Sequence, residues 1–283
     1  MTLWTELLGA EIGFIGRRYR TRALRLGEGP TLVLLHGQGG SLENFRRNVG
    51  AYARHFRVIA IDLLWHGLSE KPPIDDALVP TMIDQVLDVL DGEGVDRCHL
   101  EGQSMGGWVA AHLALRHPER LDRLVLTTPS MAENPLTAPD EDRLAAQLAG
   151  QLEILRNPTP EMVRKRMSNL VHDLSTIDEE MYAVRQAMMD RPDTNAGLQA
   201  AITAYLGPAA QALKLGPEEL GRLRVPTLLY WGSHNLGGRA AGDALAAALP
   251  AGSRYHCPDV GHWAQFEQAD EHNRVVLEFL LGG

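Results

Sequence analysis

The chain has 283 residues, of which 45% are hydrophobic and 22% are charged, and its formal net charge is −9. This composition is typical of a globular protein with enough apolar material for a large core. The negative charge argues against a nucleic-acid partner or an anionic membrane surface, because both require a basic face. No stretch approaches the roughly 18 consecutive apolar residues of a membrane span. These properties favour a small molecule as the partner.

The N-terminus lacks the features of an export signal. Residues 1–15 have no basic start followed by an apolar run, and no hydrophobic region follows Arg17-Arg18. The two cysteines, Cys98 and Cys257, each lie in a predicted strand. They indicate reduced thiols in a cytoplasmic protein rather than a disulfide. The 11 histidines show no metal-ligand spacing, so we expect neither a metal nor another cofactor.

In chain order, the first predicted element is the alternating stretch Arg18 to Leu26, which ends at Gly27-Glu28-Gly29-Pro30 and indicates an early hairpin. Short apolar runs bounded by Gly or Asp then favour strands buried on both faces of a parallel sheet. These strands are predicted at Leu32 to Leu35, Val58 to Ile61, Cys98 to Leu100, Leu124 to Thr127, Thr227 to Trp231 and Arg254 to Cys257. Helix-like segments at 42–54, 81–90 and 105–116 separate the early strands. The alternation predicts a doubly wound, mostly parallel α/β sheet.

One section interrupts the alternation of strands and helices. From about Ser130 to Pro217 the pattern is helical, with prolines at its entry and Gly207-Pro208 at its exit. An all-helical insertion between two strands of such a sheet predicts a cap over an active site. We therefore expect a core formed by residues 1–129 and 218–283, and a helical cap formed by residues 130–217.

The strongest motif is Gly102-Gln103-Ser104-Met105-Gly106, which follows a predicted strand and precedes a predicted helix. In this setting Gly-x-Ser-x-Gly is the nucleophile elbow of the α/β-hydrolase fold. The sharp turn presents Ser104, and the small residues around it leave room for the turn. The amide at the start of the following helix points toward charge that develops on a substrate oxygen. The motif predicts that Ser104 is a nucleophile.

A second glycine-rich motif, His36-Gly37-Gln38-Gly39-Gly40, follows the strand at 32–35. Oxyanion loops of this fold occupy that place in the chain. Because glycines let the backbone approach a ligand closely, we predict that amides of Gly39 and Gly40 act with the Met105 amide as the oxyanion site.

The general base of this fold follows the last strand, where Val260-Gly261-His262-Trp263 occurs. His262 is therefore the predicted base. The acid that orients the base is usually an Asp after the preceding strand, but this chain has Asn235 there. An amide can hold the imidazole but supplies no negative charge, and in a serine protease this replacement lowers turnover about 10⁴-fold.

Three interpretations of Asn235 remain open. Asn235 orients His262 in a reaction that demands less of the base, which is the interpretation we favour. Alternatively, a carboxylate elsewhere replaces it, with Glu133 the best-placed candidate and Asp140 the next. In the third interpretation the chain is an inactivated or repurposed variant.

Beyond these motifs, the chain from Leu34 to Leu281 resembles the meta-cleavage product hydrolases. The most specific stretch is Gly261-His262-Trp263-Ala264-Gln265-Phe266-Glu267-Gln268-Ala269-Asp270, and Ser104 to Ala110 and Ile61-Asp62 through His66-Gly67 also fit. The resemblance implies hydrolysis of a carbon–carbon bond in a 2-hydroxy-6-oxo-dienoate, giving a hydroxypentadienoate and a carboxylic acid.

The resemblance also implies several substrate-binding residues. Arg185 matches a cap arginine that contacts the dienoate end, and Trp263 matches the aromatic residue beside the catalytic histidine. Gln103 and Asn44 complete the predicted substrate-binding set. The chain departs from the family at Gln103, where Asn is common, and at Trp65, where a small residue is usual. These departures indicate a divergent branch.

We expect a carbon–carbon bond hydrolase with Ser104, His262 and Asn235 as its catalytic residues. An ester or lactone hydrolase of the same fold is the second hypothesis, because the elbow and the oxyanion loop serve both reactions. The third is a binding protein that keeps the fold without hydrolysis. We expect the protein to form a homodimer.

Overall fold

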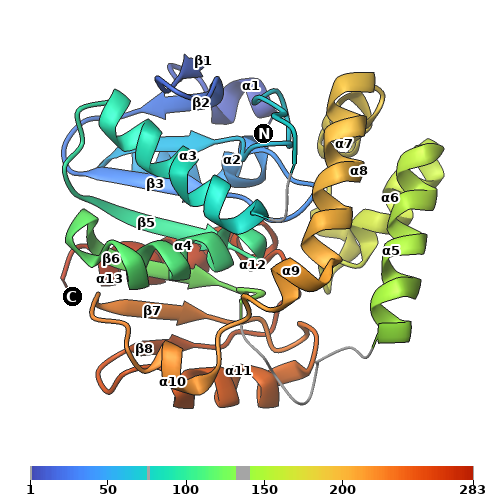
Figure 1. The fold of residues 1–283 in the computed structure, drawn as a ribbon. Helices are drawn as coiled ribbons and strands as arrows, with labels where there is room; N and C mark the ends of the chain where they lie inside the picture. Colours follow the sequence, from blue (N-terminus) through green and yellow to red (C-terminus); the bar gives the residue numbers. More distant parts are fainter. Residues whose placement is uncertain (1, 75–76, 132–140, 283) are drawn as a thin grey trace.

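In a computed structural model, residues 2–74, 77–131 and 141–282 are described. They form one sheet with helices on both faces and a helical segment beyond one end of the strands (Figure 1). The strands are β1 (Glu11–Ile15), β2 (Thr21–Leu26), β3 (Thr31–Leu35), β4 (Arg57–Ile61), β5 (Cys98–Gln103), β6 (Leu121–Thr127), β7 (Thr227–Tyr230) and β8 (Arg254–His256). Their order in the sheet is β1-β2-β4-β3-β5-β6-β7-β8.

The sheet is parallel from β4 through β3, β5, β6 and β7 to β8, and antiparallel where β1, β2 and β4 meet. The central strands are nearly continuous apolar runs because helices cover both of their faces. All residues of β3 are buried, as the sequence pattern predicts. The predicted mostly parallel α/β sheet is confirmed.

The early hairpin was predicted at the wrong turn. β2 pairs with β1, so the hairpin closes through residues 16–20. The segment Gly27-Glu28-Gly29-Pro30 instead connects β2 to β3, and β4 lies between those two strands in the sheet. Turn residues mark where a strand ends, but they do not determine which strand becomes its neighbour.

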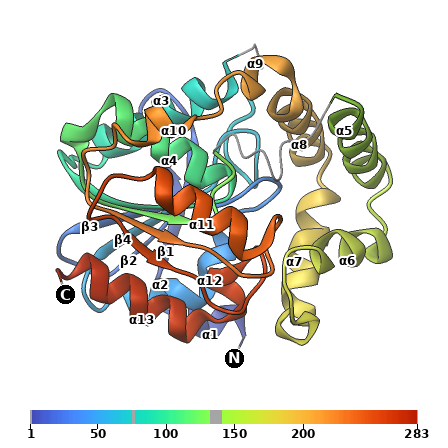
Figure 2. The same ribbon diagram turned by 90° about the horizontal axis from the view of Figure 1, so that it is seen from below.

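Two helical layers cover the sheet. Figure 2 shows α3 (Leu78–Gly92) and α4 (Met105–Arg116) on one side, and α2 (Arg46–Tyr52) and α13 (Ala269–Leu280) on the other. Each layer has its own buried apolar cluster against the sheet. The remaining short helices of this part are α1 (Leu3–Glu6), η1 (Leu42–Phe45), η2 (Pro118–Arg120), α10 (Pro217–Leu220), α11 (Gly238–Ala248) and α12 (Ala264–Glu267).

Between β6 and β7 the chain leaves the sheet for a helical segment. It contains α5 (Glu141–Arg156), α6 (Pro160–Ser168), η3 (Leu174–Thr176), α7 (Glu179–Met189), α8 (Pro192–Leu206) and α9 (Pro208–Gln211). Prolines begin α6, α8 and α9, where a missing amide costs nothing. Both views place α5 to α8 together beyond one end of the strands of the sheet (Figures 1 and 2). We call α5 to α9 the helical insertion.

Candidate active site

Ser104 occupies a strained turn between β5 and α4. Its backbone has φ 55° and ψ −115°, a conformation that is costly for a residue with a side chain. The Ser104 N–H donates to Thr127 O at 3.0 Å, which fixes the turn to β6, and the Trp108 N–H donates to Ser104 O at 3.1 Å to begin the helix. This strand–turn–helix geometry is the one expected of a nucleophile elbow.

The two glycines of the elbow leave no room for a side chain. A β-carbon on Gly102 would lie 2.3 Å from Gly106 O, and one on Gly106 would lie 2.2 Å from Leu35 O. The turn can therefore press α4 against the end of β3 only because both positions are glycine. The spacing of the motif reflects a steric requirement of this fold.

His262 lies on the loop after β8, and its ring contacts Asn235. The distance from His262 Nδ1 to Asn235 Oδ1 is 2.9 Å. Because a carbonyl oxygen can only accept, Nδ1 carries the proton and Nε2 is left with a free lone pair. The amide therefore holds the imidazole in the tautomer that a general base requires.

The environment of His262 keeps the ring neutral. Desolvation lowers the pKa of His262 to about 4. No carboxylate contacts the ring in the part of the chain that the structure describes. The alternative acids, Glu133 and Asp140, lie outside the described residues.

The loop that carries His262 is fixed against the elbow by backbone contacts. His262 O accepts from Thr128 Oγ1 at 2.7 Å and from Gln103 Nε2 at 3.3 Å. Trp263 N–H donates to Leu170 O at 2.6 Å in the helical insertion. Among the described residues no hydrogen bond joins Ser104 Oγ to His262; such catalytic contacts often form only when substrate binds. Thr128 lies in no sequence motif, so its contact with His262 could not be predicted from the chain alone.

The glycine-rich loop after β3 lies against the elbow. A β-carbon on Gly37 would lie 2.9 Å from Ser104 Cβ, so this glycine packs directly against the serine. Gly39 has φ +67°, and the Gly40 N–H donates to Gly37 O at 3.0 Å within the loop. Met105 is the first residue of α4, where a backbone N–H has no acceptor within the helix. The loop and the helix start therefore flank the serine from two sides.

A buried polar network supports this loop. His36 Nε2 accepts from the Leu63 N–H at 3.0 Å, and His36 Nδ1 contacts Gly37 O at 2.7 Å. Asp62 Oδ1 accepts from the Leu42 N–H at 2.8 Å, and Arg22 pairs with Asp62 at 3.2 Å. Burial lowers the pKa of His36 well below its usual range, so the ring is neutral. Rigid neutral and ion-paired groups thus hold the loop in place.

Arg185 reaches the site from α7 of the helical insertion. Its Nη2 donates to Asn44 Oδ1 at 3.0 Å, and its guanidinium carbon lies 5.5 Å from the centre of the Trp263 ring. Only 5% of Arg185 is exposed, and no carboxylate contacts it within the described ranges. Desolvation lowers its pKa to about 10, which leaves it protonated at neutral pH. The structure thus brings Arg185, Asn44 and Trp263 together, an arrangement expected of residues that share one binding surface.

Trp65, the departure noted beside His66-Gly67, also has a positive φ of 65°. Its indole N–H donates to Pro72 O at 2.7 Å, and its backbone contacts α8 at Gly197. These contacts stabilise Trp65 in a left-handed backbone conformation that residues with large side chains seldom adopt.

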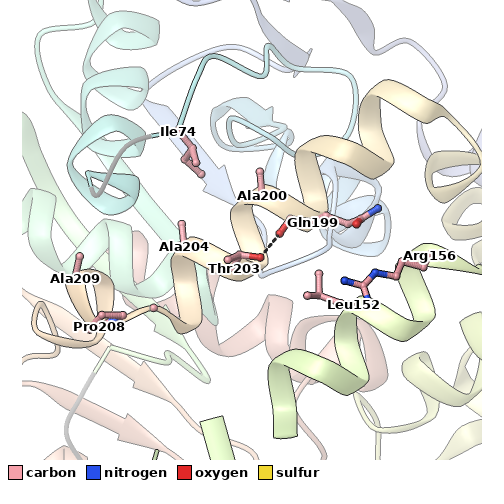
Figure 3. A pocket seen from close by; sticks show the side chains of 10 residues that line it. Ile74, Leu152, Arg156, Gln199, Ala200, Thr203, Ala204, Pro208 and Ala209 are labelled. Atoms are coloured by element: carbon pink, nitrogen blue, oxygen red, sulfur yellow. Dashed lines mark hydrogen bonds between the residues drawn. The ribbon is translucent and has the colours of Figure 1, made fainter. Parts of the chain in front are cut away.

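A separate cavity of about 560 Å³ lies between helices of the helical insertion and Ile74, which precedes α3. Figure 3 shows Leu152 and Arg156 of α5 facing Gln199 and Thr203 of α8 across it. Neither Ser104 nor Arg185 lines this cavity. The cavity is therefore separate from the candidate active site at the elbow.

The described residues contain no group of three or more His, Cys, Asp or Glu side chains arranged to hold a metal ion. No helix in the same residues has both the length and the apolar character to cross a membrane.

Comparison with known proteins agrees with the fold. The model of the alpha/beta hydrolase fold family matches residues 30–269. The chain belongs to the α/β-hydrolase fold family.

Two curated relatives are similar over most of their length. A 2-hydroxy-6-oxo-6-phenylhexa-2,4-dienoate hydrolase of Burkholderia cepacia is 30% identical over 262 residues, covering 91% of this chain and 90% of the relative. A 2-hydroxy-6-oxononadienedioate/2-hydroxy-6-oxononatrienedioate hydrolase of Paraburkholderia phymatum is 33% identical over 263 residues, covering 88% and 86%. Among solved structures, the 2-hydroxy-6-oxo-6-phenylhexa-2,4-dienoate hydrolase of Rhodococcus sp. strain RHA1 superimposes with a TM-score of 0.83 at 25% identity, covering 96% and 100%. The resemblance to meta-cleavage product hydrolases is confirmed.

Proposed function

We propose that this enzyme hydrolyses a carbon–carbon bond in a 2-hydroxy-6-oxo-dienoate. The observation that carries the proposal is Arg185, a buried cation without a carboxylate partner among the described residues, held by Asn44 and Trp263 beside His262. A desolvated guanidinium in this setting is suited to bind an anion, because a buried positive charge costs free energy until an anion neutralises it. The carboxylate of a dienoate supplies that anion. The relatives named for such substrates supply independent support.

The reaction requires proton transfer before the bond can break. The dienol must become a ketone, so its hydroxyl proton has to be delivered to carbon 5. His262 is suited to this relay because Nδ1 is held by Asn235 and Nε2 is free to take and return a proton. Such a relay between two substrate atoms begins and ends with a neutral ring, which needs less help from a carboxylate than acyl transfer does.

Ser104 acts at the ketone carbon in this proposal, either as the nucleophile or by directing water. The ketone oxygen becomes negative as the new bond forms, and the Met105 amide with an amide of the glycine-rich loop stabilises it. Cleavage of the bond between carbons 5 and 6 leaves its electron pair on the dienolate, whose charge Arg185 stabilises. His262 Nε2 takes the proton of the attacking hydroxyl and passes it to the dienolate, which leaves as the hydroxypentadienoate. If Ser104 is the nucleophile, water then hydrolyses the acyl-serine to the carboxylic acid and restores the serine hydroxyl; if water attacks directly, the acid forms in the same step.

The test uses the colour of the dienones. Wild-type protein is expected to remove the visible absorbance of 2-hydroxy-6-oxo-dienoates faster than it hydrolyses p-nitrophenyl esters. Turnover of esters with untouched dienones would contradict the proposal and favour an ester or lactone hydrolase. No turnover of either, with no labelling of Ser104 by a fluorophosphonate, would indicate a protein that keeps the fold without hydrolysis.

A further inference from the structure

A second arginine of the helical insertion approaches the glycine-rich loop. Arg166 lies in α6, and a β-carbon on Gly39 would come within 2.5 Å of Arg166 Nη2. Gly39 is two residues from Gly37, which contacts Ser104. Arg166 therefore brings a guanidinium to the same loop that flanks the predicted nucleophile, although no sequence motif marks it.

The charge of Arg166 is not neutralised by the protein. Its Nη1 donates to Gln151 on α5, which is a neutral acceptor. No carboxylate pairs with it in the ranges that the structure describes. Desolvation lowers the pKa of Arg166 to about 10, so the group stays protonated at neutral pH.

The buried arginines Arg22 and Arg46 have carboxylate partners, whereas the partly buried Arg166 has none among the described residues. Arg22 pairs with Glu43 at 2.6 Å and with Asp62 at 3.2 Å. Arg46 contacts three carboxylates. These two arginines are structural ion pairs, whereas Arg166 keeps its charge available at the glycine-rich loop.

Arg166 and Arg185 act as a pair of like charges. Besides desolvation, the charge of Arg166 contributes to the lowered pKa of Arg185. Two positive groups that repel each other in a desolvated site are costly unless a ligand balances both. A dienoate with one carboxylate places its charge at Arg185, whose lowered pKa the charges of Glu43 and Asp62 already partly offset. Arg166 is then left without an anionic partner among the described residues.

We propose that Arg166 is a specificity-determining residue that binds a second carboxylate, so that the preferred substrate is a 2-hydroxy-6-oxo-dienedioate. This proposal rests on the carbon–carbon hydrolase function proposed above and narrows it. The dienoate carboxylate meets Arg185, and the carboxylate beyond the ketone meets Arg166. The two relatives differ in this feature, since one is named for a dioate and the other for a phenyl-substituted monoacid.

The experiment compares kcat/KM for 2-hydroxy-6-oxonona-2,4-dienedioate and 2-hydroxy-6-oxo-6-phenylhexa-2,4-dienoate, followed by loss of visible absorbance. Wild-type protein should prefer the dioate. Replacing Arg166→Met should lower kcat/KM for the dioate by about 10- to 100-fold, mainly through KM, since a hydrogen-bonded charge pair contributes on this scale. The phenyl substrate should change by less than about threefold, which also reports that the variant is folded.

Two further variants control for charge and position. Arg166→Lys should retain part of the preference for the dioate, because it keeps a positive charge without the forked geometry. Arg164→Met is the matched control, because Arg164 lies on the same helix, is exposed and pairs with Glu179. Its replacement should leave kcat/KM for both substrates unchanged.

The outcomes separate this inference from the function on which it rests. Equal losses on both substrates in Arg166→Met would overturn the inference, because they would indicate a role in supporting the loop or the dienoate end. A wild-type preference for the phenyl substrate would also overturn it, while the hydrolase function would stand. Failure of wild-type protein to cleave either substrate would reject both proposals.

Discussion

The sheet with its loops contributes neutral side chains around the elbow, whereas the helical insertion contributes positively charged ones. From the sheet come Ser104 and two rings, His36 and His262, whose pKa values are lowered by burial and which are neutral at pH 7. From the helical insertion come Arg166 and Arg185, both protonated and without carboxylate partners among the described residues. Under our proposals the sheet makes and breaks bonds, and the helical insertion selects and balances an anion. Variants in the sheet part should therefore lose the chemical step, whereas variants in the helical insertion should lose recognition of the anionic substrate.

The largest effect is expected at the serine. Replacing Ser104→Ala removes the nucleophile, so kcat on a dienone should fall by at least about 10³-fold. The coloured substrate should still bind, because Arg185 and Asn44 are unchanged. Stopped-flow spectra would then contain a bound dienone that persists. A loss of less than tenfold would contradict a nucleophilic or water-directing role.

The next effect is expected in the helical insertion. Replacing Arg185→Gln should lower kcat/KM for every dienoate by about 100-fold, because the carboxylate and the developing dienolate lose their charged partner. Fluorophosphonate labelling of Ser104 should proceed at the wild-type rate, because the sheet groups remain intact. If labelling falls as far as dienone turnover, the two regions do not divide the work as proposed.

A change of pH behaviour is expected at Asn235. Since the pKa of His262 is about 4, the neutral base is present throughout pH 5 to 8, and kcat/KM of the wild type should be flat over that range. Replacing Asn235→Asp adds a negative charge that favours the imidazolium, so the pKa should rise by about 1 to 3 units. Activity of the Asp variant should therefore be lost as pH falls below about 6.5, with activity at pH 8 retained or raised.

Asn235→Ala provides the control for that experiment. It removes the acceptor at His262 Nδ1 without adding charge, so activity should fall by about 10-fold or more at every pH while the profile stays flat. A shift of the acid limb in the Ala variant, or its absence in the Asp variant, would mean that another group orients His262.

The smallest effect is expected at Gln103. Replacing Gln103→Asn shortens a side chain that reaches Thr128 Oγ1 at 3.4 Å and His262 O at 3.3 Å. Both contacts are long, so kcat/KM should fall by less than about fivefold. A decrease comparable to that of Asn235→Ala would show that Gln103 fixes the histidine loop more strongly than its distances indicate.

Local motifs were sufficient to predict the elements that chain connectivity places. Gly102 to Gly106 spans the end of β5 and the start of α4, and the lack of room for a side chain at both glycines explains why a short pattern identifies the turn. The position of His262 after the last strand and of Asn235 after the one before it follows from strand order, and the 2.9 Å contact between them agrees with that expectation. Periodicity likewise predicted the parallel core, because strands covered on both faces are continuously apolar.

What the tertiary structure decided depends on contacts between residues far apart in the chain. The pairing of β2 with β1 and with β4 is set by sheet packing, which no turn motif encodes. Thr128 is brought to the backbone of His262, and Arg166 to Gly39, by the docking of separate elements. Whether the charge of an arginine is paired with a carboxylate also depends on its neighbours in space. These neighbours cannot be read from the order of residues along the chain. The sequence by itself therefore determined the elbow and the fold, and the tertiary structure revealed the pair of cations that we propose selects the substrate.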